Sequence, residues 1–202
     1  MPLFSKISGK IGDIVGLNLG GQKVLRSMPA SYNDANTVAQ QGNRLRLAAA
    51  VLISSFVAGI LKIGFSSRPQ NQSGVNAFAA ANLPANFDAS GLATWADLKF
   101  SSGSLSQNGF SGAASKSGNN LTTNMVTTNG IDGQATDAVY VVAWNTTTNK
   151  LAGTGSGVRS ASTIVTALQP TTSGDVLALY TFAHNPSTKK SSVTSYQSFT
   201  VA

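Results

Sequence analysis

Apolar and polar positions alternate on either side of two glycines near the start of the chain. The runs "DIVGLNL" (13–19) and "QKVLRSM" (22–28) flank Gly20 and Gly21. A pair of glycines between such runs predicts a β-hairpin, because the tight turn needs positive φ angles that glycine adopts without strain. Pro29 ends the second strand in this interpretation, since proline has no backbone N–H to donate.

From residue 38 the apolar positions recur at helical spacing. Thr37, with Gln40 three residues later, has the form of a capping box and predicts a helix over residues 38–64. Residues 47–61 are uncharged and carry apolar side chains around most of the helix. Such a helix is expected to be buried on most sides, either at the centre of a domain or in a seam between subunits. We expect the seam, as an assembly interface, to contain Leu52, Phe56 and Ile60.

The second half of the chain has a different pattern. A short helix is predicted from Ser73 to Pro84, and short apolar runs then alternate with Gly, Ser, Asn and Thr turns. Strands are expected near residues 95–100, 121–127, 138–144, 150–154, 162–168, 176–183 and 191–201. This spacing predicts an antiparallel β-sandwich of the fibronectin type III or immunoglobulin kind. The fold class is therefore α+β, with a hairpin–helix region over 1–88 and a sandwich domain over 89–202.

Composition narrows the chemistry. The chain of 202 residues has no Cys, one His, and Asp as its only acid, and 10% of its residues are charged. No phosphate-loop or dinucleotide-binding motif is present. His184 is interpreted as a surface turn residue, and Asp132 and Asp137 as turn residues of "NGIDGQATD". We therefore expect no enzyme activity, with no catalytic residue, no metal and no cofactor.

Positive charge is concentrated near the N-terminus. Residues 1–68 contain eight basic and two acidic residues, whereas the whole chain has a net charge of +7. Basic segments of this kind bind nucleic acid or other anionic surfaces, or simply remain solvated. The candidate contacts to phosphates or other anions are Lys6, Lys10, Lys23, Arg26, Arg44 and Arg46.

Membrane insertion and secretion are not predicted. The 15 uncharged residues 47–61 fall short of the roughly 20 that a spanning helix needs. The segment after Lys10 is interrupted by glycines and Asp13, unlike the apolar core of a secretory signal.

Several motifs together resemble an uncharacterised bacterial family of domains of unknown function. They are "GKIGDIVG", "GGQKVLRSMP", "TVAQQGNRLRL", "KIGF" and "GVNAF", followed by the strand "GDVLALY" and the Ser/Thr-rich "SSVTSYQSF". The resemblance covers nearly the whole chain and implies a two-part architecture with a C-terminal β-domain. It implies no activity. Members of the family usually have a Trp in the first strand, where this chain has "LNL".

These observations favour a structural protein that assembles with itself. We expect a shell, spike, fibre or decoration component of a phage-like particle, located in the virion or in the cytoplasm before assembly. Its partners would be other copies of the chain and further particle proteins. Two alternatives stay open: a protein that binds nucleic acid weakly and without sequence preference through its basic third, and a surface or peripheral membrane-binding module.

Overall fold

A three-stranded antiparallel sheet forms the N-terminal unit. The computed structural model describes residues 9–19, 21–28, 35–83, 85–91 and 93–202, and the chain divides into the units Met1–Thr37 and Val38–Ala202. The sheet contains β1 (Gly9–Ile11), β2 (Ile14–Leu19) and β3 (Gln22–Ser27), in that order. The predicted hairpin is present as the β2–β3 pair, and Gly21 in its turn has a φ of 90°.

The described residues of the N-terminal sheet form no hydrophobic core of their own. Strand β1, which the sequence pattern did not indicate because three residues are too few to show alternation, pairs with β2. Among the side chains and glycines described in this unit, only Gly16 is buried. A sheet of three short strands needs an apolar face packed on another surface to be stable. The unit therefore requires something outside itself to cover it.

Three helices begin the second unit: α1 (Val38–Phe56), α2 (Ala58–Gly64) and α3 (Gly74–Asn82). The short helix predicted after Ser73 is confirmed as α3. Its N-cap is Ser73, whose Oγ accepts a hydrogen bond from the backbone N–H of Asn76 at 3.0 Å. Pro84, the predicted stop, lies outside the described residues.

The prediction of one continuous helix over residues 38–64 is wrong, because α1 and α2 are bent by 92° at a break. The Oγ atoms of Ser54 and Ser55, just before the break, donate hydrogen bonds to backbone carbonyls three residues earlier, at 3.2 and 2.8 Å. Serines that bond back in this way compete with the helix backbone and favour a kink. Beyond Ser55, the bend lets Val57 and Leu61 reach the core, where both are buried.

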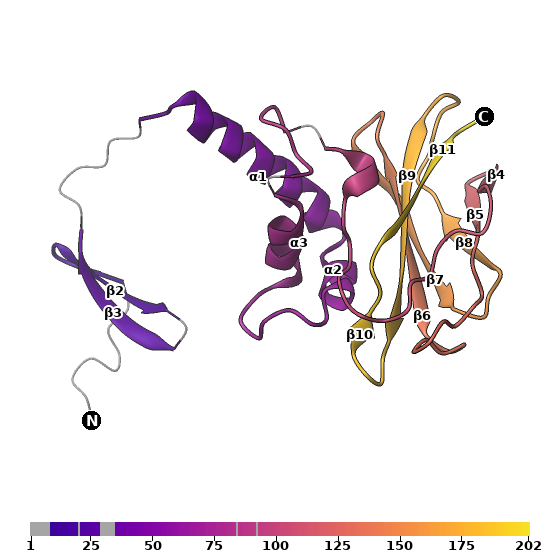
Figure 1. Ribbon diagram of the computed structural model, residues 1–202. Coiled ribbons are helices and arrows are strands. Elements are labelled where there is room, and N and C mark those ends of the chain that lie inside the picture. Colours follow the sequence, from indigo (N-terminus) through magenta and orange to yellow (C-terminus); the bar gives the residue numbers. More distant parts are fainter. Residues whose placement is uncertain (1–8, 20, 29–34, 84, 92) are drawn as a thin grey trace. The chain divides into compact units, whose positions relative to one another are not determined.

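Two antiparallel sheets form the C-terminal part (Figure 1). The larger sheet has the order β10-β9-β6-β7, with β11 also paired to β9, and the smaller sheet has the order β4-β5-β8. The strands are β4 (Ser115–Ser117), β5 (Asn120–Asn124), β6 (Ala138–Asn145), β7 (Lys150–Val158), β8 (Thr163–Ala167), β9 (Val176–Asn185), β10 (Lys190–Ser191) and β11 (Ser195–Thr200).

The strand predicted near residues 95–100 is wrong. That segment forms the short 3-10 helix η1 (Trp95–Asp97) followed by irregular backbone. Trp95 packs against the core formed by the helices and the larger sheet, with its ring 6.4 Å from that of Trp144. The hydroxyl of Tyr180 donates a hydrogen bond to the carbonyl of Trp95 at 2.7 Å, and burial raises the pKa of that hydroxyl. The aromatic residues that suggested a strand therefore serve packing.

The larger sheet is buried on both faces, in a three-layer arrangement of helices, large sheet and small sheet (Figure 1). On the helical side, Trp144, Tyr180 and Phe182 pack in one cluster with Leu61 and Phe78. On the opposite side, two clusters join the large sheet to the small one; they contain Leu121, Ala143, Leu177 and Leu179, and Met125, Val139, Val141 and Ile164.

Both ends of the β6–β9 pair are closed by the same polar contact. The side-chain amide of Asn185, at the end of β9, donates to the carboxylate of Asp137, just before β6, at 2.8 Å. Reciprocally, the amide of Asn145, at the end of β6, donates to Asp175, just before β9, at 2.8 Å. The hydrogen bonds that Asp175 accepts from Thr172 and Asn145 lower the pKa of its carboxyl.

Glycines on β7 allow β8 to lie against it. Gly153, Gly155 and Gly157 alternate along β7, and a Cβ on either of the first two would overlap Ala167 or Thr166, respectively. β8 is hydrogen-bonded to β5 rather than to β7, so this approach joins the two sheets mainly by packing. A backbone hydrogen bond adds to it, from the N–H of Gln169, just after β8, to the carbonyl of Ala152 on β7 at 2.6 Å.

The sequence-based boundary after residue 88 falls inside the cluster that the helices share with the large sheet, and it can be tested directly. We expect a fragment of residues 38–202 to unfold cooperatively, as one unit. A fragment of residues 89–202 should be less stable by several kcal/mol, because Trp144, Tyr180 and Phe182 lose their cover and each contributes about 1.5–3 kcal/mol when buried. Thermal unfolding by near-ultraviolet circular dichroism compares the two. Equal stability of both fragments would support the boundary at residue 88.

The buried ion pair of Arg159 and Asp137 gives a second test. The guanidinium Nε lies 3.2 Å from Oδ2 of Asp137, and both side chains are at most 1% exposed. Arg159→Met should lower the free energy of unfolding by about 3–5 kcal/mol, because it leaves a buried carboxylate without its cation. Adding Asp137→Asn to that variant should recover part of the loss. Urea denaturation measures both, and a loss below about 1 kcal/mol for Arg159→Met would contradict the interpretation.

Candidate assembly surface

Among the described residues of the second unit, helix α1 packs against its neighbours along one side. Ala50 and Ile53 are buried in the helical cluster, and Gly42 lies against Ala89 with room for no larger side chain without adjustment. The Nε of Arg46 donates a hydrogen bond to the carbonyl of Phe87 at 3.2 Å. These contacts fix which face of α1 is turned inward.

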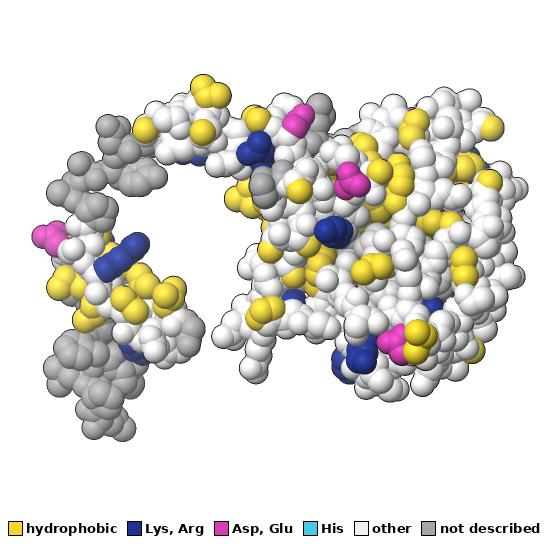
Figure 2. All heavy atoms as spheres, in the orientation of Figure 1, with side chains coloured by type: hydrophobic (Ala, Val, Ile, Leu, Met, Phe, Trp, Pro, Cys, Tyr) yellow, Lys and Arg dark blue, Asp and Glu magenta, His cyan; other side chains and the backbone are white. Residues whose placement is uncertain are grey.

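Large apolar side chains remain exposed next to that inward face. We define the α1 stripe as Val38, Leu45, Leu52 and Phe56, which are 85%, 50%, 42% and 55% exposed. Their spacing of seven, seven and four residues places them on one side of the helix. Leu47 and Val51, on the other flank, are also exposed. Figure 2 shows hydrophobic side chains along the exposed side of this helix.

Within the described chain this helix is not buried on most sides, so it does not lie at the centre of a domain, and the alternative setting, a seam between subunits, stays a prediction. The helical pattern was interpreted correctly as apolar around most of its circumference, but the sheet offers only one face for it to cover. Helix α3 and residues 85–91 cover the inward side of α1. The apolar surface left over lies on the side that faces away from the chain's own core.

Of the three predicted seam residues, the structure brings two to this surface. Leu52 and Phe56 belong to the α1 stripe, and the Phe56 ring also makes an edge contact with Trp144 at 5.9 Å between centroids. Ile60 lies beyond the bend, in α2, and is partly buried against the core. Val38 and Leu45 complete the stripe and were not named as seam residues, although they precede Leu52 by fourteen and seven residues, a spacing that marks them in the sequence.

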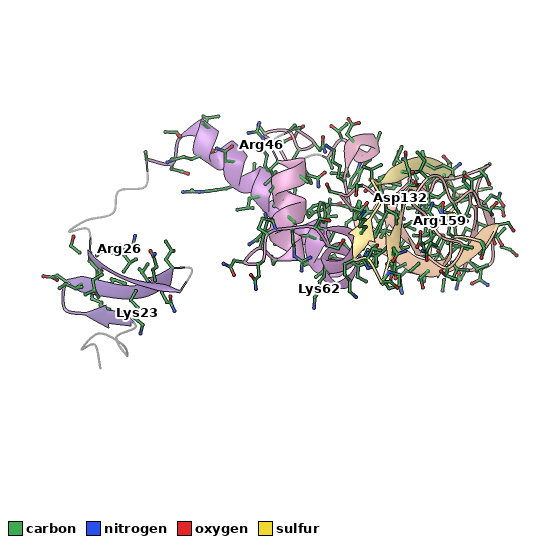
Figure 3. The ribbon with its side chains drawn as sticks, turned by 60° about the horizontal axis from the view of Figure 1, so that its bottom comes forward. Lys23, Arg26, Arg46, Lys62, Asp132 and Arg159 are labelled. Carbon is green, nitrogen blue, oxygen red and sulfur yellow. The ribbon has the colours of Figure 1, made fainter. Side chains whose placement is uncertain are left out.

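Of the predicted anion contacts that the structure describes, three lie on the two faces of the N-terminal sheet and two lie on α1 in the other unit. Lys10 and Arg26 lie on the same face of the N-terminal sheet, since each is paired with Val15, whereas Lys23 lies on the opposite face (Figure 3). Arg44 and Arg46 belong to α1 in the other unit, and Arg46 is engaged with Phe87. Lys6 lies outside the described residues.

The acidic residues and the histidine singled out in the sequence have structural partners. Asp132 accepts hydrogen bonds from the backbone N–H and the hydroxyl of Ser106, which lower the pKa of its carboxyl. Asp137 is buried against Arg159, a partnership that the sequence pattern did not reveal. His184 is 8% exposed rather than a surface turn residue, and its Nδ1 lies 2.9 Å from the Ser191 hydroxyl. Among the described residues, no three acidic or histidine side chains come together in a way that could hold a metal ion.

Among the described residues, no single helix is long and apolar enough to cross a membrane. Helices α1 and α2 reach the length and composition of a membrane span only when they are taken together, and that pair is bent by 92°.

The fold and this surface define a two-unit α+β protein in which an apolar helix is left uncovered beside a three-layer core. The chain belongs to a family of unknown function, DUF6266, whose model matches residues 6–196. The family resemblance noted from the sequence motifs is thereby confirmed. Neither a curated protein nor a solved structure matches the chain.

Two substitutions on α1, one at an exposed position and one at a buried position, test which face of the helix is inward. Leu45→Asp should change the free energy of unfolding by less than about 1 kcal/mol, because Leu45 is half exposed in the chain. Ile53→Asp should cost more than about 4 kcal/mol, because it buries a carboxylate without a partner. Urea denaturation at low protein concentration measures both, and equal losses would contradict the described orientation.

Proposed function

We propose that this protein is a non-enzymatic structural component that assembles with copies of itself through α1. The observation that carries the proposal is the α1 stripe, a row of four large apolar side chains that are 42–85% exposed on a helix otherwise anchored to a rigid core. Contiguous exposed apolar surface of this kind is characteristic of interaction sites.

A second copy of the chain suits this surface. The stripe contains no charged residue, and residues 47–61 are uncharged throughout. A two-fold contact brings identical surfaces together, so like charges would oppose it and an uncharged apolar stripe does not. The stripe also has the seven-residue recurrence that lets two helices pack side by side.

The free energy gained by burying the α1 stripe limits how strongly two copies can associate through it alone. Burying one large apolar side chain contributes about 1.5–3 kcal/mol, and association costs about 4–15 kcal/mol in lost freedom of motion. Because three of the four side chains are already about half buried, the stripe supports only weak pairing. Assembly beyond that needs a second surface, and the N-terminal sheet, with Ile14 and Leu25 about half exposed, supplies a further apolar surface on each chain.

An apolar surface on each of the two units supports extended assembly rather than a closed dimer. A component of a particle, such as a shell, spike, fibre or decoration protein of a phage-like virion, is the setting that we propose. Nucleic-acid binding through the basic third is the second candidate. Its support is that Lys10 and Arg26 lie on one face of the N-terminal sheet, on either side of Val15, and that both are exposed.

We propose further that the C-terminal sheets form an immunoglobulin-like sandwich. The orders β4-β5-β8 and β7-β6-β9-β11 correspond to strands A-B-E and C′-C-F-G of such folds. All of these pairs are antiparallel, as that topology requires. What sets this chain apart is that helices cover the outer face of the C′-C-F-G sheet.

Sedimentation velocity over a concentration series tests self-assembly. We expect the weight-average sedimentation coefficient to rise with concentration and to rise equally at 0.15 and 0.5 M salt, because apolar burial drives the association. The double variant Leu45→Asp with Leu52→Asp should remove most of that rise. Phe56 is left unchanged because its ring contacts Trp144 within the chain.

The matched control is Val165→Asp on β8, which places the same charge at an apolar position that is 57% exposed but lies outside α1. This variant should associate as the unchanged protein does. A monomer at all concentrations would overturn the proposal. Association only when an oligonucleotide is added, and lost at 0.5 M salt, would instead favour the nucleic-acid candidate.

A further inference from the structure

A pocket of about 510 Å³ lies between α2 and the turn that joins β9 to β10, and three basic side chains are part of its lining. Lys62 comes from α2, Arg68 from the connection to α3, and Lys189 from the β9–β10 turn. His184, at the end of β9, also lines it, and none of the described lining residues is acidic. None of them belongs to α1.

The three cations of this pocket are gathered without acidic partners. Among the described residues, Lys62, Arg68 and Lys189 form no salt bridge. Arg68 is held rigidly, since its Nε donates to the carbonyl of Gln72 at 2.7 Å and its Nη1 to that of Lys62 at 2.7 Å. Like charges brought to one concave surface repel each other, and an anion between them reverses the sign of that interaction.

A comparison within the chain shows that Lys189 stands where its backbone favours another residue. The turns "NTTTNK" (145–150) and "NPSTKK" (185–190) have the same geometry, because the side chain of the first Asn accepts hydrogen bonds from the second and third backbone N–H groups after it. The fifth residue is left-handed in both, with φ of 53° at Asn149 and 58° at Lys189. Asn tolerates that conformation better than Lys does. Lys189 therefore occupies a strained position at which the equivalent turn has asparagine. Backbone strain of this kind is concentrated at functional sites, which suggests that the charge of Lys189 has a function at the pocket.

We propose that this pocket binds a small phosphate-class anion, either free phosphate or a phosphate monoester. The ammonium groups of Lys62 and Lys189 and the guanidinium of Arg68 supply the charge-assisted hydrogen bonds that such an anion takes. His184 borders the same space and is the chain's single histidine, so its imidazole reports on the pocket alone. Burial and the charge of Lys189 lower the pKa of His184, and Asp137 opposes that effect.

The test is a titration of the full chain with inorganic phosphate, and separately with a nucleoside 5′-monophosphate, against chloride at matched ionic strength. The readout is the imidazole resonance of His184. We expect a saturable shift and a rise in the pKa of His184 with phosphate, because a bound anion favours the imidazolium. Lys189→Asn should keep the turn, as Asn149 shows, and weaken binding by about tenfold; Lys62→Ala should weaken it similarly.

Lys150→Ala is the matched control, because Lys150 directly follows the left-handed residue of the other turn, as Lys190 does in this one, and does not line this pocket. It should bind as the unchanged protein does, and thermal unfolding verifies that each variant is folded. A shift with the monophosphate but not with phosphate would assign the site to monoesters. No saturable shift with either ligand, or the same affinity in Lys189→Asn, would overturn the proposal. Oligonucleotide binding that survives Lys189→Asn would place nucleic-acid contacts elsewhere and would not count in its favour.

Discussion

The antiparallel pairing of β6 with β9 is the constraint on which the second unit depends. Eight residues of each strand face each other in continuous register from Ala138 opposite His184 to Asn145 opposite Leu177. Both faces of this pair are buried, so two further layers must exist to cover it. The two reciprocal Asp–Asn contacts fix the ends of the pair. Their buried polar atoms are hydrogen-bonded only in this register, so a shift of either strand would leave them without partners.

The helical layer follows from that requirement, and so does the surface that we assign to assembly. Covering one face of the large sheet uses α2, α3 and the inward side of α1, because the bend at Val57 is what lets the chain turn onto the sheet. Helix α1 carries apolar side chains around most of its surface, and the sheet can bury only those on one side. The α1 stripe is therefore a product of the same geometry that completes the core.

Local signals in the sequence predicted most elements of this fold, whereas the relations between distant elements could not be read from it. The Gly20–Gly21 pair, the Ser73 cap and the strand alternation each depend on a few neighbouring residues, and each marked its element correctly. The bend before Val57 and the 3-10 turn at Trp95 depend on tertiary packing, which overrides local preference. For the candidate site, Leu52 and Phe56 were recognisable as apolar, but periodicity could not say which side of a uniformly apolar helix would meet the core. The pair of Asp137 and Arg159, 22 residues apart, and the pocket beside His184 needed the folded chain.

The glycines on β7 limit which substitutions this strand can accept. At Gly153 and Gly155 even the single carbon of alanine would overlap β8, while the intervening Thr154 and Ser156 are exposed. Substitutions that leave the fold unchanged can therefore accumulate at Thr154 and Ser156 but not at Gly153 and Gly155. Members of the family that share this contact should retain a G-x-G-x-G pattern after their surfaces have diverged, which gives distant relatives a recognisable mark that hydrophobicity alone would not.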